Sequence, residues 1–118
     1  MAAQTAQLIY HMCTRREWEE ARARGTYTGS SQDATDGFIH FSSAEQLPAS
    51  ARRHRAGQTD LMLLAVDPTL LGSALRWEAS RGGALFPHLY GALLVTDVRW
   101  VSDLPLGADG LHILPALE

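Results

Sequence analysis

The sequence predicts an α+β fold in which helices pack on a largely antiparallel sheet. Short apolar runs bounded by turn residues recur along the chain, and the run Leu61–Val66 is nearly all apolar, as is typical of a strand buried on both faces. Two capping-box patterns, at Thr14 and Ser43, each place Glu or Gln three positions after a hydroxyl residue and indicate helix starts. The 118 residues, 46% of them hydrophobic, suit a single domain over residues 1–118.

The first half is expected to alternate strands and helices. Residues 8–12 form a short apolar run that indicates a strand. Arg15–Arg24 is predicted to be a helix that ends at Gly25. Residues 28–36 are rich in Gly, Ser, Asp and Thr and predict a loop. Residues 37–41 indicate a second strand.

Alternation along this second strand places Phe38, His40 and Ser42 on one face. The helix predicted from the second capping box is expected to be opened or split by Pro48 and to end near Arg55.

The second half is predicted to consist mainly of strands. Strands are expected over residues 61–66, 75–78 and 93–101. Between them we expect a turn over residues 67–72, a flexible loop over residues 80–84, and an extended or turned segment over residues 86–91. The core is therefore expected over about residues 8–101, with residues 102–118 as a tail or an edge element.

Composition argues against several classes of function. Ten arginines, no lysine and thirteen acidic residues give a net charge of −3, which argues against non-specific nucleic-acid binding and excludes Schiff-base and P-loop chemistry. No apolar run approaches the roughly 20 residues that span a bilayer, so no membrane association is expected. Residues 1–7 lack the basic and apolar regions of a signal peptide. The single Cys13 excludes an intramolecular disulfide, and we expect a reducing, cytoplasmic setting.

Two histidines in the first half are candidate site residues. His11 ends the first strand just before a helix N-terminus, where free backbone N–H groups favour an anion, although a backbone carbonyl could also satisfy its ring. His40 lies between Ile39 and Phe41, and a polar ring in an apolar strand must find hydrogen-bond partners. It belongs either to a structural network or to a residue set that faces a cleft.

A second group of candidates lies in the other half. His88 and Tyr90 are two residues apart, so an extended chain would present both to one ligand, whereas a packed turn would place Tyr90 in the core. Glu78 follows Trp77 and could hold a ribose hydroxyl, act as a general base, or pair with an arginine on an edge strand.

The remaining candidates favour structural roles. His54 lies in the basic cluster of residues 52–55, late in a predicted helix, where cations complement the helix dipole; a phosphate site is the minority alternative. Cys13, two residues from His11, gives weak support for a nucleophile. The spacings among the three candidate histidines match no local metal motif, so no metal site is expected.

An ordered series of motifs over residues 8–101 resembles the bacterial family known as domain of unknown function 952. The series comprises Ile9-Tyr10-His11, Trp18, Ala21, Gly25, Tyr27, residues 37–46, Leu63-Leu64, Asp67, Leu71, Arg76-Trp77-Glu78 and residues 86–91. The family has no established activity, so this resemblance implies shared positions but no reaction.

The first half is also similar to the start of an ADP-ribosyltransferase-type domain, as in poly(ADP-ribose) polymerases and RNA 2′-phosphotransferases. In that pattern a strand ends in His, and a hydroxyl residue, a helix, a Gly and a strand carrying Tyr or His follow; His11, Thr14, Gly25 and His40 occur in this order. The resemblance implies an ADP-ribosyltransferase-like split sheet with two or three helices. It also implies NAD or an ADP-ribose-like nucleotide as ligand.

The resemblance further implies roles for single residues. His11 would hydrogen-bond the adenosine ribose of NAD, and His40 would line the nicotinamide-ribose side of the cleft. Thr14, Ser42 and Tyr90 would be further cofactor-binding residues.

Catalysis of the kind that the resemblance implies is metal-independent transfer at the nicotinamide-ribose carbon, through an electrostatically stabilised oxocarbenium-like state. The catalytic residues would be His11 and His40, with His88 and Glu78 as candidates for the third position. The alternative is a non-catalytic ligand-binding or interaction module that keeps the cleft without turnover. A histidine–metal hydrolase is a third, more remote hypothesis.

Overall fold

The structure is a computed structural model that describes residues 7–117. Its helices are α1 (Arg15–Arg24), α2 (Ser31–Asp36) and α3 (Leu47–Arg55). Its strands are β1 (Ile9–Thr14), β2 (Thr26–Tyr27), β3 (Ile39–His40), β4 (Ser42–Ser43), β5 (Leu61–Val66), β6 (Leu75–Ala79), β7 (Leu85–Leu89), β8 (Leu93–Leu94) and β9 (Val98–Leu104).

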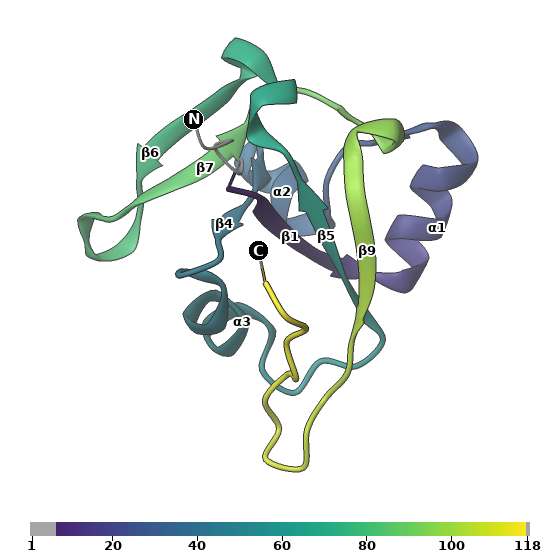
Figure 1. Cartoon of the computed structure of the whole chain (residues 1–118), viewed down its shortest axis with the longest axis vertical. Helices are drawn as coiled ribbons and strands as arrows, with labels where there is room; N and C mark the ends of the chain where they lie inside the picture. The colour runs from purple at the N-terminus through teal and green to yellow at the C-terminus, as the bar shows by residue number, and fades with distance from the viewer. Residues whose placement is uncertain (1–6, 118) are drawn as a thin grey trace, which may run out of the picture.

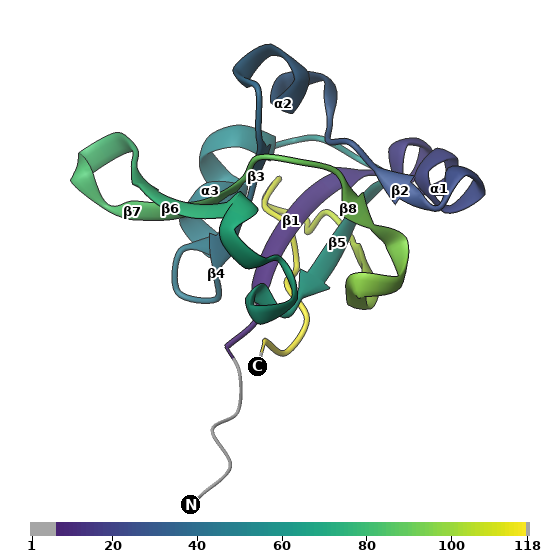
Figure 2. The same cartoon turned by 90° about the horizontal axis from the view of Figure 1, so that it is seen from above.

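The strands form one larger and two smaller sheets. The larger sheet has the order β4-β1-β5-β9, a second has the order β3-β7-β6, and β2 pairs with β8. Every pair of these strands is antiparallel. Figure 1 shows α1 and α3 on different sides of β1 and β5, and Figure 2 shows the β6–β7 pair extending to one side. The predicted α+β class with largely antiparallel sheets and two or three helices is confirmed.

The larger sheet is covered on both faces, which explains the apolar sequence of β5. Leu61, Leu63 and Ala65 pack in a cluster with Leu47 of α3, whereas the intervening β5 residues pack in a cluster that contains Trp18 of α1. All six β5 residues are buried, as the sequence predicts for this segment. Burying a leucine side chain contributes about 2 kcal/mol, so β5 anchors both clusters.

The first predicted helix has the expected ends. The Thr14 hydroxyl accepts a hydrogen bond from the Glu17 N–H, and the Glu17 carboxylate accepts one from the Thr14 N–H. The helix stops at Gly25, whose φ of 88° is in the left-handed region that favours glycine.

The loop predicted over residues 28–36 is wrong in its second part, which forms α2. Ser30 caps this helix in a reciprocal pair with Asp33, and Gly37 ends it. Local hydrogen bonding therefore outweighs a composition that is typical of loops. Figure 2 shows α2 above β3 at one end of the molecule.

The second predicted capping box closes a turn rather than a helix. Ser43 and Gln46 exchange the expected pair of side chain–backbone bonds, but α3 starts one residue later, and Pro48 lies in its first turn. Pro48 therefore opens the helix and does not split it, because the first turn requires no N–H from that residue.

Two predicted strands are divided in the structure. Residues 37–41 contain β3, but the chain then leaves that sheet at Phe41, whose N–H donates to the Pro87 carbonyl, and continues as β4 in the larger sheet. The strand predicted over residues 93–101 becomes β8, a 3-10 turn and β9, because its two parts pair with different strands, β2 and β5.

For two segments, residues 86–91 and residues 102–118, the sequence leaves alternatives open. The segment predicted over residues 86–91 is extended, since most of it belongs to β7. Beyond β9, Leu106 bridges to His112, and Leu114 packs against the α3 side of the core.

Candidate functional site

A cleft opens where the larger sheet is incomplete. β4 pairs with β1 only at Ile9 and Tyr10, whereas β1 continues to Thr14, so the β1 edge is uncovered from His11 onward. A cavity of about 840 Å³ lies at this edge, and its lining includes His11, Asp33, His40, Arg53, Arg55 and His88. The split between the sheets thus creates the cleft.

His11 lies in the floor of the cleft with both ring nitrogens engaged. Nδ1–H donates to the His40 carbonyl over 2.6 Å, and because a carbonyl only accepts, this bond fixes the tautomer. Nε2 then accepts from the Tyr27 hydroxyl over 2.6 Å. Burial lowers the pKa of His11, and the Asp33 carboxylate, 3.6 Å from Nε2, only partly opposes this effect. The ring is therefore a neutral connector between β1, β2 and β3.

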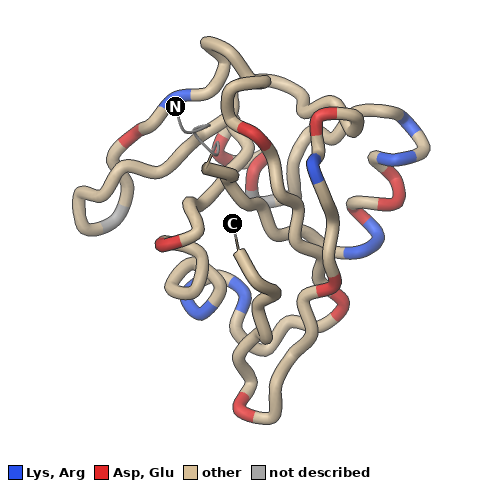
Figure 3. Tube along the Cα trace, viewed as in Figure 1, with Lys and Arg blue, Asp and Glu red and all other residues tan. Residues whose placement is uncertain are grey.

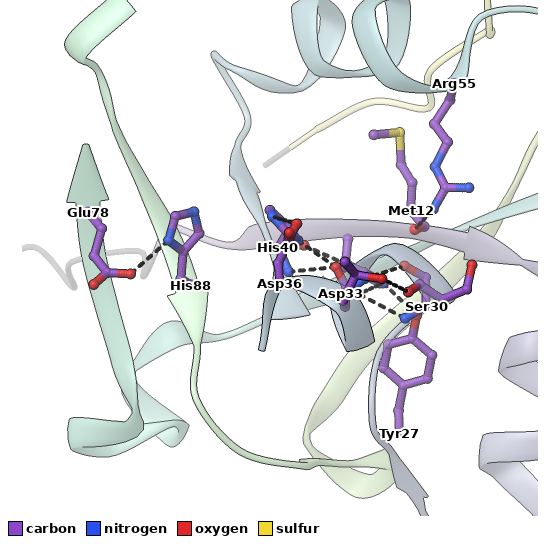
Figure 4. Close-up of polar contacts among 12 residues, drawn as sticks. Met12, Tyr27, Ser30, Asp33, Asp36, His40, Arg55, Glu78 and His88 are labelled. Carbon is purple, nitrogen blue, oxygen red and sulfur yellow. Dashed lines mark hydrogen bonds and ion pairs between the residues drawn. The ribbon is translucent and has the colours of Figure 1, made fainter. Parts of the chain in front are cut away.

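Asp33 is a buried carboxylate that collects several donors. Oδ2 accepts from the Ser30 N–H over 2.8 Å, and Oδ1 accepts from the His40 ring over 2.5 Å and from the His40 backbone N–H over 3.3 Å. Burial alone would raise the pKa of Asp33, but the hydrogen bonds with His40 and Ser30 hold it below its usual value. Figure 4 shows Asp33 between Ser30 and His40, where it carries a negative charge beneath the cleft.

His40 stands between two carboxylates of α2. Its Nδ1 faces Asp33, and its Nε2 lies 3.1 Å from Oδ2 of Asp36. Both contacts are hydrogen bonds at the same time only when both ring nitrogens carry protons. The His40 ring is 40% exposed, so it is accessible from the cleft as well as tied to α2.

His88 is positioned by a second carboxylate, on β6. Oε1 of Glu78 accepts from the Tyr90 hydroxyl over 2.7 Å and from Nδ1–H of His88 over 2.9 Å. These two bonds lower the pKa of Glu78. The Phe38 ring stacks on the His88 ring with centroids 4.1 Å apart, and the His40 and His88 centroids are 5.5 Å apart. Figure 4 shows Glu78 and His88 on neighbouring strands beside His40.

The structure brings together some of the residues predicted for the site. His11, His40, Ser42 and His88 line the cavity. His54, for which the sequence favoured a structural role, also lines it.

Three others, Thr14, Glu78 and Tyr90, are not among the lining residues. Thr14 caps α1, whereas Glu78 accepts hydrogen bonds from both His88 and the Tyr90 hydroxyl.

Sequence reasoning missed Asp33, Asp36 and Tyr27, which hold the two central histidines. The available signal for Asp33 was its position three residues after Ser30, in the spacing of a capping box. Tyr27 and Asp36 carry no comparable local signal, because their partners are determined by tertiary packing.

Other side chains near the cleft have structural roles. Cys13 is buried, and burial raises the pKa of its thiol to about 12, so it is un-ionised and a poor nucleophile near neutral pH.

Within residues 7–117, no group of three or more His, Cys, Asp or Glu side chains is arranged to hold a metal ion. No helix in the described part of the chain is long and apolar enough to cross a membrane.

Fold and site together define a small α+β domain in which split antiparallel sheets hold a histidine–carboxylate network at an open cleft. The chain belongs to the family described as protein of unknown function (DUF952), whose sequence profile matches residues 12–101. This confirms the first of the two resemblances.

The fold is similar to that of protein CC0527 from Caulobacter crescentus. Its crystal structure matches with a TM-score of 0.87 and 51% identity, over 90% of this chain and 93% of that chain. Its solution NMR structure matches with a TM-score of 0.80 and 52% identity, over 88% of this chain and 90% of that chain. No curated protein matches the chain.

Proposed function

We propose that the cleft binds a nucleotide of the NAD or ADP-ribose class. The observation that carries this proposal is the convergence of His11, His40 and His88, far apart in sequence, on one cavity of about 840 Å³. Pockets for small ligands commonly measure about 300 to 1,000 Å³ and combine apolar walls with a few placed polar groups. The order of His11, Thr14, Gly25 and His40 also supports the proposal through its similarity to ADP-ribosyltransferase-type domains.

The histidines have different tasks in this proposal. His88 donates Nδ1–H to Glu78, so Nε2 is the ring nitrogen left to contact a ligand hydroxyl or carboxamide in the cleft. Asp36, the last residue of α2, contacts a ribose hydroxyl, and the half-buried His40 ring of β3 packs beside the same sugar. His11 acts through its neighbours as a positioning residue, because its nitrogens are occupied by the His40 carbonyl and Tyr27.

A second candidate function is transfer of the ADP-ribosyl group, and the ionised carboxylate of Asp33 beneath the cleft favours it. The bond between C1′ of the nicotinamide ribose and the ring nitrogen breaks, and nicotinamide leaves with the electron pair. Negative charge at Asp33 stabilises the cationic sugar through space. With water as acceptor, its oxygen bonds to C1′ and its proton passes to solvent.

Titration calorimetry with NAD and with ADP-ribose tests binding. His88→Ala should weaken the affinity at least tenfold, because it removes the presented ring nitrogen. His112→Ala makes the same change outside the cavity lining and should leave the affinity within about twofold of wild type. Absence of binding at millimolar ligand, or equal affinity of both variants, contradicts the proposal.

Chromatography of the NAD incubated with the protein separates the two candidates. Nicotinamide release that Asp33→Asn abolishes, in protein shown to be folded by circular dichroism, supports transfer. Binding without nicotinamide release assigns the cleft to a non-catalytic ligand-binding module.

A further inference from the structure

The C-terminal end of α3 contributes a separate kind of chemistry to the cleft. Arg53, His54 and Arg55 all line the cavity; Arg53 and His54 are exposed, and Arg55 is half-buried. Figure 3 shows basic segments on α3, and Figure 4 shows Arg55 reaching from that helix toward Met12 of β1. Cationic side chains therefore border the same space as the histidines.

The Arg55 guanidinium is held in place. One terminal nitrogen donates to the Met12 carbonyl over 3.0 Å, and the other donates to Oε1 of Gln58 over 3.0 Å. The carbonyl is accessible because β4 pairs with β1 only as far as Tyr10. A guanidinium has five N–H donors, so this anchoring leaves donors for a ligand.

Some arginines of the chain pair with carboxylates, and the arginines at the cleft do not. Arg15, Arg16, Arg22 and Arg99 each have a carboxylate partner within 3.4 Å. Among the ion pairs of residues 7–117, none includes Arg53 or Arg55, and none includes Arg24, Arg52 or Arg76. Arg53 and Arg55 differ from these three because they line the cavity.

Arg53 and Arg55 are therefore two cations that border one cavity without a carboxylate partner. An anion from outside the chain is the partner that such a site fits, and the planar guanidinium suits phosphate in particular.

We infer that Arg53 and Arg55 form a diphosphate subsite of the cleft. Their guanidinium groups bind the phosphate oxygens, while the histidine–carboxylate side holds the sugars. This inference rests on the proposed function, since it names the part of the nucleotide that the α3 wall recognises. It implies that the cleft selects nucleoside diphosphates over uncharged nucleosides.

A pair of neighbouring arginines provides a matched test. Arg52 and Arg53 are both exposed on α3, but only Arg53 lines the cavity. By calorimetry, Arg53→Ala should weaken ADP-ribose binding roughly tenfold, because a charge-assisted bond is lost, and leave adenosine binding unchanged. Arg52→Ala should keep both affinities within about twofold of wild type.

Salt provides an independent readout. Raising KCl from about 50 to about 200 mM should weaken ADP-ribose binding more in wild type than in Arg53→Ala, because fewer ionic contacts remain to be screened in the variant. Equal losses of affinity in the Arg52→Ala and Arg53→Ala variants, or no loss in Arg53→Ala, would overturn the subsite.

Inorganic pyrophosphate separates failure of the subsite from failure of the proposed function. Suppose that neither ADP-ribose nor adenosine binds the wild type. Amide NMR shifts at residues 53–55 with pyrophosphate, retained in Arg52→Ala and absent in Arg53→Ala, would then support the subsite while the nucleotide proposal fails. No shift at these residues would overturn the subsite as well.

Discussion

The buried ring of His11 links the chemistry of the site to the stability of the protein. Its Nδ1–H donates to the His40 carbonyl, and its Nε2 accepts from Tyr27, so the neutral ring joins three strands. Burial lowers the pKa of His11 from the ordinary value of 6.5 despite the nearby Asp33. Protonation of this ring is therefore coupled to unfolding.

Acid should destabilise the protein through His11. Below pH 6.5 and down to the lowered folded pKa, the unfolded state binds more protons than the folded state, so stability falls as the pH falls. His11→Gln removes this titration. Urea unfolding at pH values of about 7.5 and about 5 should show a smaller loss for the variant, the difference being at most about 1.4 kcal/mol per pH unit. Equal losses in both proteins would show that His11 is not the coupled group.

At the scale of elements, the short helix α2 carries the acidic side of the site. Ser30 and Asp33 cap it reciprocally, and the same Asp33 carboxylate holds His40. The cap is thus also the support of a cleft residue. α1 has an equivalent cap at Thr14, outside the cavity lining.

Variants of these two caps distinguish an effect on stability from an effect on ligand binding. Ser30→Ala and Thr14→Ala should each lower the free energy of unfolding by about 1 kcal/mol, because each leaves a helix N-terminus uncapped. Only Ser30→Ala should also weaken ADP-ribose binding, measured by calorimetry at a temperature where both variants are folded. Similar ligand affinities of the two variants would contradict a role of α2 in ligand binding.

Most elements could be predicted because their signals are local. The α1 cap, the Gly25 stop and the apolar β5 run each lie within a few neighbouring residues. α2 was missed because six residues are too short for a helical repeat of apolar positions, and Asp replaces the usual Glu or Gln of the capping box. The division of residues 93–101 was missed because an apolar run does not reveal that its halves have different partners.

The candidate site was predictable only in part, because sequence signals are local and the partners of the site residues come from other elements. His40 could be singled out because a polar ring among apolar strand residues requires partners, and His88 because it lies two residues from Tyr90. The identity of those partners, Asp33 and Glu78, depends on contacts between separate elements. Glu78 was singled out by its neighbours in sequence, whereas Asp33 was hidden in a segment predicted to be a loop.

At the scale of the whole molecule, the larger sheet supports an apolar cluster on each face. β1 and β5 contribute to both clusters, and β1 also forms the floor of the cleft. The site therefore depends on the packing of the whole sheet as well as on its own hydrogen bonds.

Removing apolar volume from β5 should test this packing. Leu63 is fully buried, so Leu63→Ala should lower the free energy of unfolding in urea by about 2 to 5 kcal/mol. Leu70→Ala, at a position 57% exposed, is the matched control and should change it by less than about 0.5 kcal/mol. A small effect of Leu63→Ala would contradict the central role of β5.

The central claim, a nucleotide cleft at the split between the sheets, is tested most directly by an amide NMR titration of the protein with NAD. If NAD binds in this cleft, the shifts should be concentrated at His11, His40 and residues 86–91, the segments that meet at the cavity. No shifts at millimolar NAD, or shifts confined to α1, which contributes no residue to the cavity lining, would contradict it.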